Sequence, residues 1–308
     1  MNYKKIIKSR SLRLKILSLL SWIPDKTMLQ IQYRLKFGRN LNLKNPKRFT
    51  EKIQWYKLYY RNPDMVRCAD KSDVRDYLTE RGFGEYLTKT YGTYDSPLDI
   101  PFEDLPKSFV LKDTLGGGGT SVIIVRDKDK ENISELIRQM QNWCEQRIVP
   151  NGGREWVYYH GKKHRIIVEE YLESEMPHGL VDYKFYCFNG FSPYVNVIFD
   201  RKLGQGKAKI FYLTRDYVDT GAYHPEEGKI DSNELIPKPE NYEELRSVAE
   251  KISGEFPLVR VDLYDIKGKI YFGEMTFFDA SGYLLFEPDE FDYELGECFK
   301  LPKEIIKR

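Results

Sequence analysis

Two carboxylates near the C-terminus have the spacing of a cation site. Asp262 lies in a β-prone segment at 258–264 and Glu274 in a second one at 269–275, with Lys267-Gly268 between them. A hairpin that turns there places both carboxylates opposite each other on one face, with Arg260 beside them. Paired carboxylates repel unless a cation lies between them, and Mg²⁺ commonly binds one or two carboxylates together with nucleotide phosphates. We therefore predict a Mg²⁺ site, with Arg260 placed to stabilise an oxyanion; a solvated polar face is the alternative.

A lysine and a glycine run earlier in the chain have the chemistry of a phosphate site. Lys112 ends a strand-like segment at 108–112, and four glycines follow before a β-branched segment at 121–125: Gly116, Gly117, Gly118 and Gly119, then Thr120. Glycines let backbone N–H groups approach phosphate oxygens, and the lysine adds positive charge. The run is no P-loop, because no GK[ST] follows, and no kinase loop, because the lysine precedes the glycines. A flexible hairpin turn is the alternative, although four glycines cost much entropy.

Helices and strands must position these groups. Helical spacing is predicted over 11–36, with a break at Pro24 and Asp25 as a cap, and over 50–60, 70–81, 133–146 and 243–253. The predicted strands are 108–112, 121–125, 165–172, 183–188, 194–199, 258–264 and 269–275, with a second hairpin turn at Asn189-Gly190. Helices and strands mix without strict βαβ alternation, so the sequence predicts an α+β fold.

Composition limits the function further. The 308 residues are 41% hydrophobic and 31% charged, which is typical of a globular chain of one complex domain or two to three lobes. The four cysteines and four histidines show no zinc-ligand or disulfide spacing. A reducing cytoplasm is the predicted location.

The N-terminal segment is strongly basic. Residues 1–50 carry thirteen Lys or Arg and one acid, so this segment has a charge of +12 within a chain of +2. No stretch reaches the roughly 18 apolar residues of a membrane span. Residues 1–24 combine six basic residues with an apolar run, which would allow peripheral contact with the inner face of the membrane. The alternative is a helix docked on the domain with a solvated basic face, and no nucleic-acid module is recognised.

The order of these motifs resembles the ATP-grasp superfamily, which includes D-alanine–D-alanine ligase. The resemblance implies a small and a large lobe that clamp ATP, preceded by a basic, mostly helical region (1–65) and a lead-in helix and linker (66–106). It implies a small lobe at 107–172 and a large catalytic lobe at 173–308.

The same resemblance implies roles for individual residues. Lys112 and the loop from Gly116 to Thr120 match the phosphate-binding lysine and the lid. Arg260 and Arg201 match catalytic arginines, and Asp262 and Glu274 match metal carboxylates, while Thr276 replaces the usual metal-binding asparagine. The residues Glu169, Glu170, Tyr171 and Leu172 match the hinge that contacts adenine. Asp182 and Lys184 match a pair of charged residues on the next strand.

A narrower resemblance covers most of the chain. Phe49 to Trp55, Ala69 to Lys71, Asp182 to Phe185 and Phe272 to Thr276 are similar to motifs of the TupA-like ATP-grasp family. That family is named for a protein of teichuronopeptide biosynthesis, and its members belong to capsule, O-antigen or exopolysaccharide pathways. The resemblance implies an ATP- and Mg²⁺-dependent ligase that joins an amino acid to a uronate-containing glycan or its precursor, with Lys71 near phosphate.

Two other functions stay open. Some members of the resembled family carry a glycosyltransferase label, so a glycosyltransferase of a capsule or O-antigen pathway is one alternative. A non-catalytic protein that binds a polyanion or membrane through the basic N-terminus is the second alternative.

Overall fold

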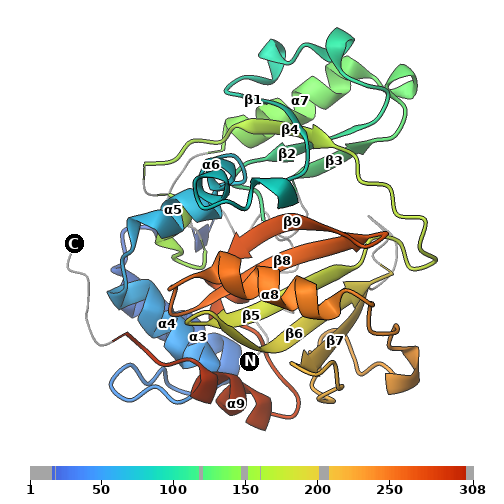
Figure 1. Ribbon diagram of the computed structural model, residues 1–308. Helices are drawn as coiled ribbons and strands as arrows, with labels where there is room; N and C mark the ends of the chain where they lie inside the picture. Colours follow the sequence, from blue (N-terminus) through green and yellow to red (C-terminus); the bar gives the residue numbers. More distant parts are fainter. Residues whose placement is uncertain are drawn as a thin grey trace. The chain divides into compact units, whose positions relative to one another are not determined.

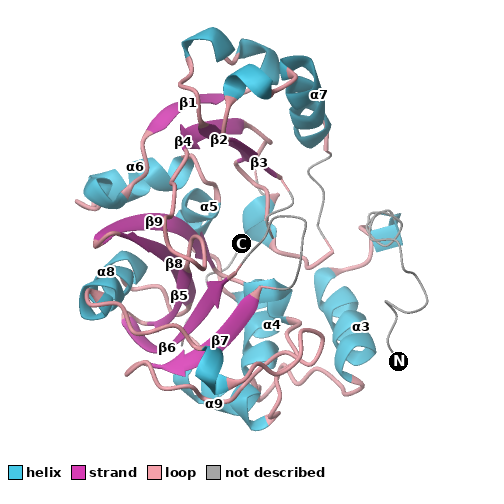
Figure 2. Cartoon of the chain, turned by 90° about the vertical axis from the view of Figure 1, so that its right-hand side faces the viewer, coloured by secondary structure: helices cyan, strands magenta, loops and turns pink. Residues whose placement is uncertain are grey.

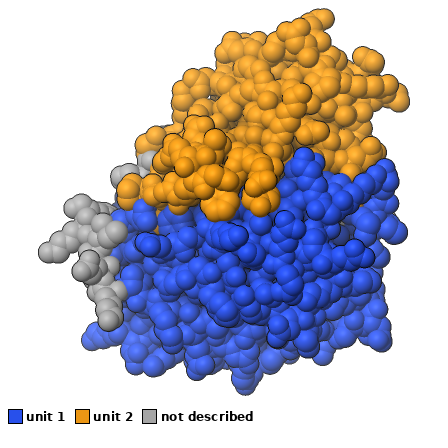
Figure 3. Space-filling model, in the orientation of Figure 1, with its two compact units in different colours: residues 1–62, 149–156, 175–308 blue, residues 63–148, 157–174 orange. Residues whose placement is uncertain are grey.

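The computed structural model describes residues 16–17, 19–117, 121–146, 152–159, 161–200 and 208–302. The chain divides into two compact units (Figure 3). Unit 1 comprises 1–62, 149–156 and 175–308, and unit 2 comprises 63–148 and 157–174. Each unit contains one antiparallel sheet with helices, so the predicted α+β class is confirmed. The four predicted regions stay a prediction.

Unit 2 is a four-stranded sheet with a helix on one face. Its strand order is β1-β4-β2-β3. The elements are α5 (Pro63–Ala69), α6 (Asp73–Glu80), β1 (Thr90–Tyr94), β2 (Phe109–Asp113), β3 (Val122–Val125), α7 (Ile133–Cys144) and β4 (Ile166–Glu170). Asn132 caps α7 by accepting from the N–H of Glu135, and Leu136 and Met140, four residues apart, pack on Leu111 and Val168. The opposite face of the sheet carries Lys112 and Glu169.

Unit 1 is built on a five-stranded sheet of order β7-β6-β5-β8-β9 (Figure 1). Its strands are β5 (Asp182–Phe188), β6 (Phe191–Phe199), β7 (Lys209–Thr214), β8 (Val259–Ile266) and β9 (Lys269–Thr276). Its helices are α3 (Asp25–Phe37), α4 (Phe49–Tyr59), α8 (Tyr242–Ser253) and α9 (Glu290–Cys298), with a 3₁₀ turn, η7 (Asp279–Gly282), after β9.

Two tight turns set the register of this sheet. Asn189 and Gly190 join β5 to β6, and Lys267 and Gly268 join β8 to β9; all four residues have positive φ. That conformation matches the twist of a two-residue hairpin, and both predicted hairpins are confirmed. Near the end of β9 the pairing shifts by one residue at Gly273, where a Cβ would approach the carbonyl oxygen of Asp262 to 3.0 Å.

The two faces of the sheet differ in chemistry. Helix α8 covers one face (Figure 2). On this face Phe185 of β5 contacts Tyr242 of α8. Strand alternation directs Lys184 and Asp262 to the other face. Helix α4 packs at the border of that face through Phe49, whose ring meets Tyr186.

Helices α4 and α9 are joined by charged hydrogen bonds. The Arg48 guanidinium makes a two-pronged contact with Asp289, at 2.6 and 2.5 Å. The Asp292 carboxylate accepts from the backbone N–H of Thr50 at 2.9 Å and from its hydroxyl at 2.8 Å. The start of α4 is therefore anchored to a helix about 240 residues later in the chain.

Some expectations about elements were wrong or incomplete. Helix α3 has Pro24 rather than Asp25 as its N-cap, and the Asp25 carboxylate pairs with Arg154 at 3.0 Å. Strand β1 lies where a linker was predicted, and β7, α5 and α9 were not predicted. In the part of the chain that the structure describes, no helix is long and apolar enough to cross a membrane.

Candidate active site

A row of polar side chains crosses all five strands of unit 1. Cross-strand pairing aligns Tyr212, Asn196, Lys184, Asp262 and Glu274 from β7 to β9. Directly opposed residues of antiparallel strands have neighbouring Cβ atoms on one face. The predicted opposition of Asp262 and Glu274 is confirmed, and the sheet adds Lys184 on the other side of Asp262.

Arg260 links the carboxylates of this row. Its Nε and Nη2 lie 2.8 and 2.9 Å from the two carboxylate oxygens of Asp262, in a bidentate contact. Its Nη2 also lies 3.2 Å from Oε1 of Glu274. The guanidinium therefore bridges the two carboxylates that were predicted to need a cation between them.

Two further residues join this centre that the sequence reasoning missed. The Arg260 guanidinium contacts Asp279, and Asp279 also accepts a hydrogen bond from the hydroxyl of Tyr186. Tyr186 was visible as the position two residues after Lys184 on the same strand face. Asp279 follows the end of β9 in η7, and no local pattern marks it as facing Arg260.

Burial and neighbouring charges have opposite effects on the pKa of the Asp262 carboxyl. Burial raises the pKa of the Asp262 carboxyl, while the charges of Arg260 and Lys184 counteract that rise. Lys184 contacts Asp262 directly and lies 3.7 Å from Asp182. Among the described residues, the buried Oδ1 of Asn196 has no hydrogen-bond partner.

The residues predicted in unit 2 form a separate ionic cluster. Nζ of Lys112 lies 2.6 Å from Glu169, whose other carboxylate oxygen accepts from Arg75 and from the Thr88 hydroxyl, both at 3.1 Å. Burial alone would raise the pKa of Glu169, but the Lys112 and Arg75 charges hold it below its usual range. Glu169, predicted as part of an adenine hinge, is thus the buried counter-ion of the predicted phosphate-binding lysine.

Lys71 lies at the start of the glycine loop. Its Nζ donates to the carbonyl of Gly116, and its backbone N–H donates to the carbonyl of Thr114 at 3.0 Å. This contact places a second lysine of unit 2 beside the predicted lid. The rest of the loop, Gly118, Gly119 and Thr120, and also Arg201, lie outside the described residues.

The other hinge positions follow β4. The Glu170 N–H donates to the carbonyl of Lys89 at 2.9 Å, and Tyr171 accepts from Arg126 at 3.3 Å. Leu172 is half-buried next in the chain. The backbone of this segment lies in unit 2, together with Lys112.

The donor set of unit 1 fits a magnesium ion shared with a nucleotide. Asp262 and Glu274 supply hard oxygens on one face, and the Thr276 hydroxyl lies 3.4 Å from Glu274. Among the described residues, no three His, Cys, Asp or Glu side chains converge to hold a metal ion by themselves. Mg²⁺ takes few protein carboxylates when phosphates complete its shell, so this pair suits Mg²⁺ bound with ATP.

Comparisons with known proteins agree with this geometry. A family model described as TupA-like ATPgrasp matches residues 51–300. No curated protein matches the chain significantly.

Solved structures with some similarity have low identity and TM-scores. D-alanine–D-alanine ligase from Bacillus anthracis is 18% identical, with a TM-score of 0.41 over 68% of this chain and 57% of that one. The Helicobacter pylori ligase of the same name is 13% identical, with a TM-score of 0.44 over 82% and 69%. The ATP-grasp ligase PsnB, complexed with minimal precursor, Mg and ADP, is 11% identical, with a TM-score of 0.41 over 82% and 66%. This chain therefore spans less than two thirds of the first of these proteins.

Proposed function

The chain belongs to the TupA-like ATP-grasp family of ATP-dependent ligases, and on that premise we propose that it forms an amide between a carboxylate and an amine. The observation that carries the proposal is the convergence of Arg260, Lys184 and three carboxylates on one sheet face. Such a face suits the positioning and charge stabilisation on which phosphoryl transfer depends.

The first step activates the carboxylate. A carboxylate oxygen of the substrate attacks the γ-phosphorus of ATP, the bond to the β–γ bridging oxygen breaks, and ADP leaves. Lys112, Lys71 and Arg201 would neutralise phosphate charge, and the segment from Glu169 to Leu172 would contact adenine. Mg²⁺, held by Asp262, Glu274 and Thr276, would supply charge neutralisation at the phosphates.

The second step forms the amide. The amine nitrogen attacks the acyl carbon, the bond to the phosphate oxygen breaks, and inorganic phosphate leaves as the nitrogen loses a proton. Arg260 would stabilise the oxyanion of the tetrahedral intermediate, because its side chain is only 11% exposed and its guanidinium carries several N–H donors. Lys184 and Asp182 would place one positive and one negative charge beside the reacting groups.

We infer the substrate class from the family. Its namesake acts in teichuronopeptide biosynthesis, so we propose a uronic acid of a bacterial surface polysaccharide or its precursor as the carboxylate. A free amino acid is the proposed amine. This places the reaction in capsule or cell-envelope assembly, on the cytoplasmic side of the membrane.

The test is ADP release with ATP and Mg²⁺ over uronate-containing glycans crossed with free amino acids, with hydroxylamine present to trap acyl phosphate. ADP and hydroxamate that depend on one carboxylate would support the ligase. If the chain binds ATP but releases no ADP, the tested substrates are the wrong ones. If it neither binds ATP nor releases ADP, the proposed ligase activity is rejected. Nucleotide-sugar hydrolysis without ATP would favour a glycosyltransferase.

A further inference from the structure

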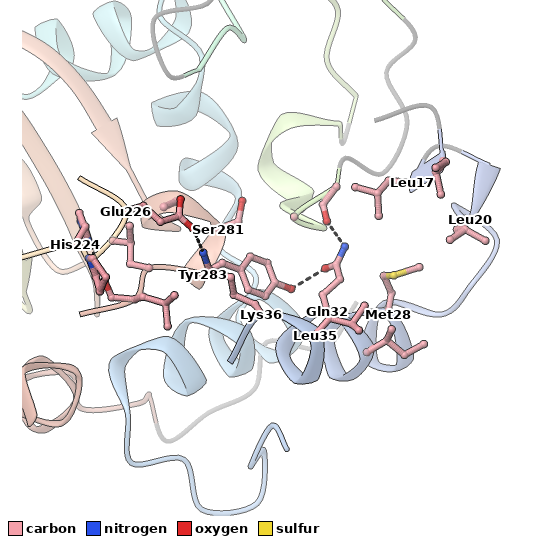
Figure 4. A pocket seen from close by; sticks show the side chains of 18 of the residues that line it. Leu17, Leu20, Met28, Gln32, Leu35, Lys36, His224, Glu226, Ser281 and Tyr283 are labelled. Atoms are coloured by element: carbon pink, nitrogen blue, oxygen red, sulfur yellow. Dashed lines mark hydrogen bonds and ion pairs between the residues drawn. The ribbon is translucent and has the colours of Figure 1, made fainter. Parts of the chain in front are cut away.

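Unit 1 contains a large apolar pocket whose wall meets the polar row of the sheet at one end, where the Tyr212 hydroxyl and Nε2 of His224 are 2.6 Å apart. It encloses about 570 Å³ between α3, the segment 16–23 and the loops 224–227 and 280–285 (Figure 4). Ligand pockets commonly fall between about 300 and 1,000 Å³. Aliphatic side chains make up much of the wall, among them Leu17, Leu20, Met28, Ile31, Leu35 and Leu285.

Polar groups in the wall already have partners. Gln32 donates to the carbonyl of Gly152 at 2.5 Å and accepts from the Tyr283 hydroxyl at 2.7 Å (Figure 4). Lys36 pairs with Glu226 at 3.0 Å, and His224 contacts the carbonyl of Leu285 at 2.8 Å. A polar ligand group would have to break these bonds, so the wall favours a hydrocarbon.

Large hydrophobic side chains are exposed on α3 and on the segment before it, both of which contribute to the lining of the pocket. Ile31 and Leu35, one turn apart on α3, are 44% and 41% exposed, and Leu19 and Trp22 are each 77% exposed. Four of the nine large hydrophobic residues exposed in the described chain thus lie within residues 19–35. Concentrated exposed apolar area marks an interaction surface, and tryptophan favours the boundary between lipid and water.

Charge complementarity identifies the partner. Residues 1–15 contain Lys4, Lys5, Lys8, Arg10, Arg13 and Lys15 and no acidic residue. A basic cluster next to exposed apolar residues attracts anionic lipid, at about 1 kcal/mol per Lys or Arg near the surface. A second copy of this chain would instead bring its own basic segment against the first, which is repulsive.

We propose that this pocket takes a hydrocarbon chain of an anionic membrane lipid, while Leu19 and Trp22 insert at the membrane surface and the basic residues contact headgroups. A single apolar contact or a basic segment alone gives weak binding, and the two together give stable peripheral attachment. The inference does not depend on the ligase reaction, because no residue of the polar row takes part.

The experiment is sedimentation of the full chain with phosphatidylcholine vesicles, with and without phosphatidylglycerol, and displacement of bound cis-parinaric acid by phosphatidylglycerol. The double variant Ile31→Glu/Leu35→Glu puts two carboxylates in the lining of the pocket, on exposed positions that should not disturb folding. It should lower vesicle and probe affinity about tenfold or more, since burying each side chain is worth at least ~1.5 kcal/mol. Trp22→Ser should weaken vesicle binding and leave probe binding unchanged.

The matched control is Leu98→Glu, which changes a 67% exposed leucine of unit 2 and should bind vesicles and probe as the unchanged chain does. Vesicle binding that is equal in the double variant and the unchanged chain would overturn the proposal. So would probe binding that appears only after residues 1–15 are deleted, because the chain's own N-terminus would then be the occupant. A dimer that dissociates in the double variant, without vesicle binding, would assign the surface to a second copy.

Discussion

Charge balance at the residue scale explains how the candidate active site holds together. Four carboxylates (Asp182, Asp262, Glu274 and Asp279) surround two cations, Arg260 and Lys184, which leaves a formal charge of −2. Arg260 satisfies the need for a cation between Asp262 and Glu274, so the pair alone does not demand a metal. The remaining negative charge nevertheless favours a divalent cation, and Mg²⁺ binding stays a prediction.

Glu274 provides the first mutational test. Glu274→Ala should abolish ATP turnover, because it removes half of the carboxylate pair proposed to bind Mg²⁺. The free energy of unfolding should change by about 1 kcal/mol or less, because the ion pair between Glu274 and Arg260 is partly exposed. ADP release and thermal unfolding measure the two effects. Glu255→Ala, an exposed carboxylate of the same unit, is the control; an active Glu274→Ala would refute the metal assignment.

Glu169 makes the stability of unit 2 depend on pH. The pKa of its carboxyl is lower in the folded chain than in the unfolded one, so its ion pairs stabilise fully above the unfolded value of about 4.3. This contribution is lost as the pH falls through the lower folded pKa. Between pH 6 and 3 (approximate limits), the unchanged chain should therefore lose more stability than Glu169→Gln. Urea unfolding across that range measures the difference; parallel curves would contradict the prediction.

At the scale of elements, the local sequence pattern was enough to predict which residues share a sheet face wherever a turn fixed the strand register. Asn189-Gly190 and Lys267-Gly268 are turns that few other residues could form, and alternation from them places Lys184, Asp262 and Glu274 on one face. The site was therefore predictable along β5, β8 and β9.

Other parts of the site depend on packing between distant segments, which the local sequence pattern does not predict. Asp279 reaches Arg260 only because η7 folds back after β9, and Asn196 joins the row only through pairing of β6 with β5. Strand β1 contains Gly92, with a bulge next to it, so its sequence lacks a clear alternation. These features depend on contacts between distant residues, which a single sequence does not reveal.

Helix α4 holds the loop that carries Asp279. Buried Lys57 donates to the carbonyls of Gly153 and Ser281, both at 2.7 Å, and to the side chain of Gln54 at 2.9 Å. Lys57→Met keeps the packing but removes the donor to these three acceptors, of which only the Ser281 carbonyl keeps another donor, Gln54 at 3.0 Å, so it should destabilise unit 1 by about 2 kcal/mol.

Chemical denaturation measures this loss of stability, and turnover should fall as well, because Asp279 orients Arg260. Lys251→Met changes an exposed lysine of α8 in the same unit and should change stability by less than about 1 kcal/mol. Equal stability of the two variants would show that Lys57 does not hold η7.

At the scale of the whole molecule, residues proposed to act on ATP come from both units. A non-hydrolysable ATP analogue with Mg²⁺ should therefore slow amide hydrogen exchange near Gly116 and Gly117 in unit 2 and around η7 in unit 1. Hydrogen-exchange mass spectrometry measures both regions, with the turn at Ser232–Glu234 as an unaffected reference. Protection in one unit alone would restrict the nucleotide site to that unit.

The joining of α4 to α9 has a consequence for synthesis of the chain. A ribosome makes residues 49–59 early, but Asp289 and Asp292, which anchor Arg48 and Thr50, emerge about 240 residues later. Unit 2 lies wholly between these segments, at 63–148 and 157–174, and can complete its fold first. Until then α4 exposes Phe49, which is 1% exposed in the finished protein. A chaperone that binds nascent chains would therefore meet a long-lived apolar target in this helix.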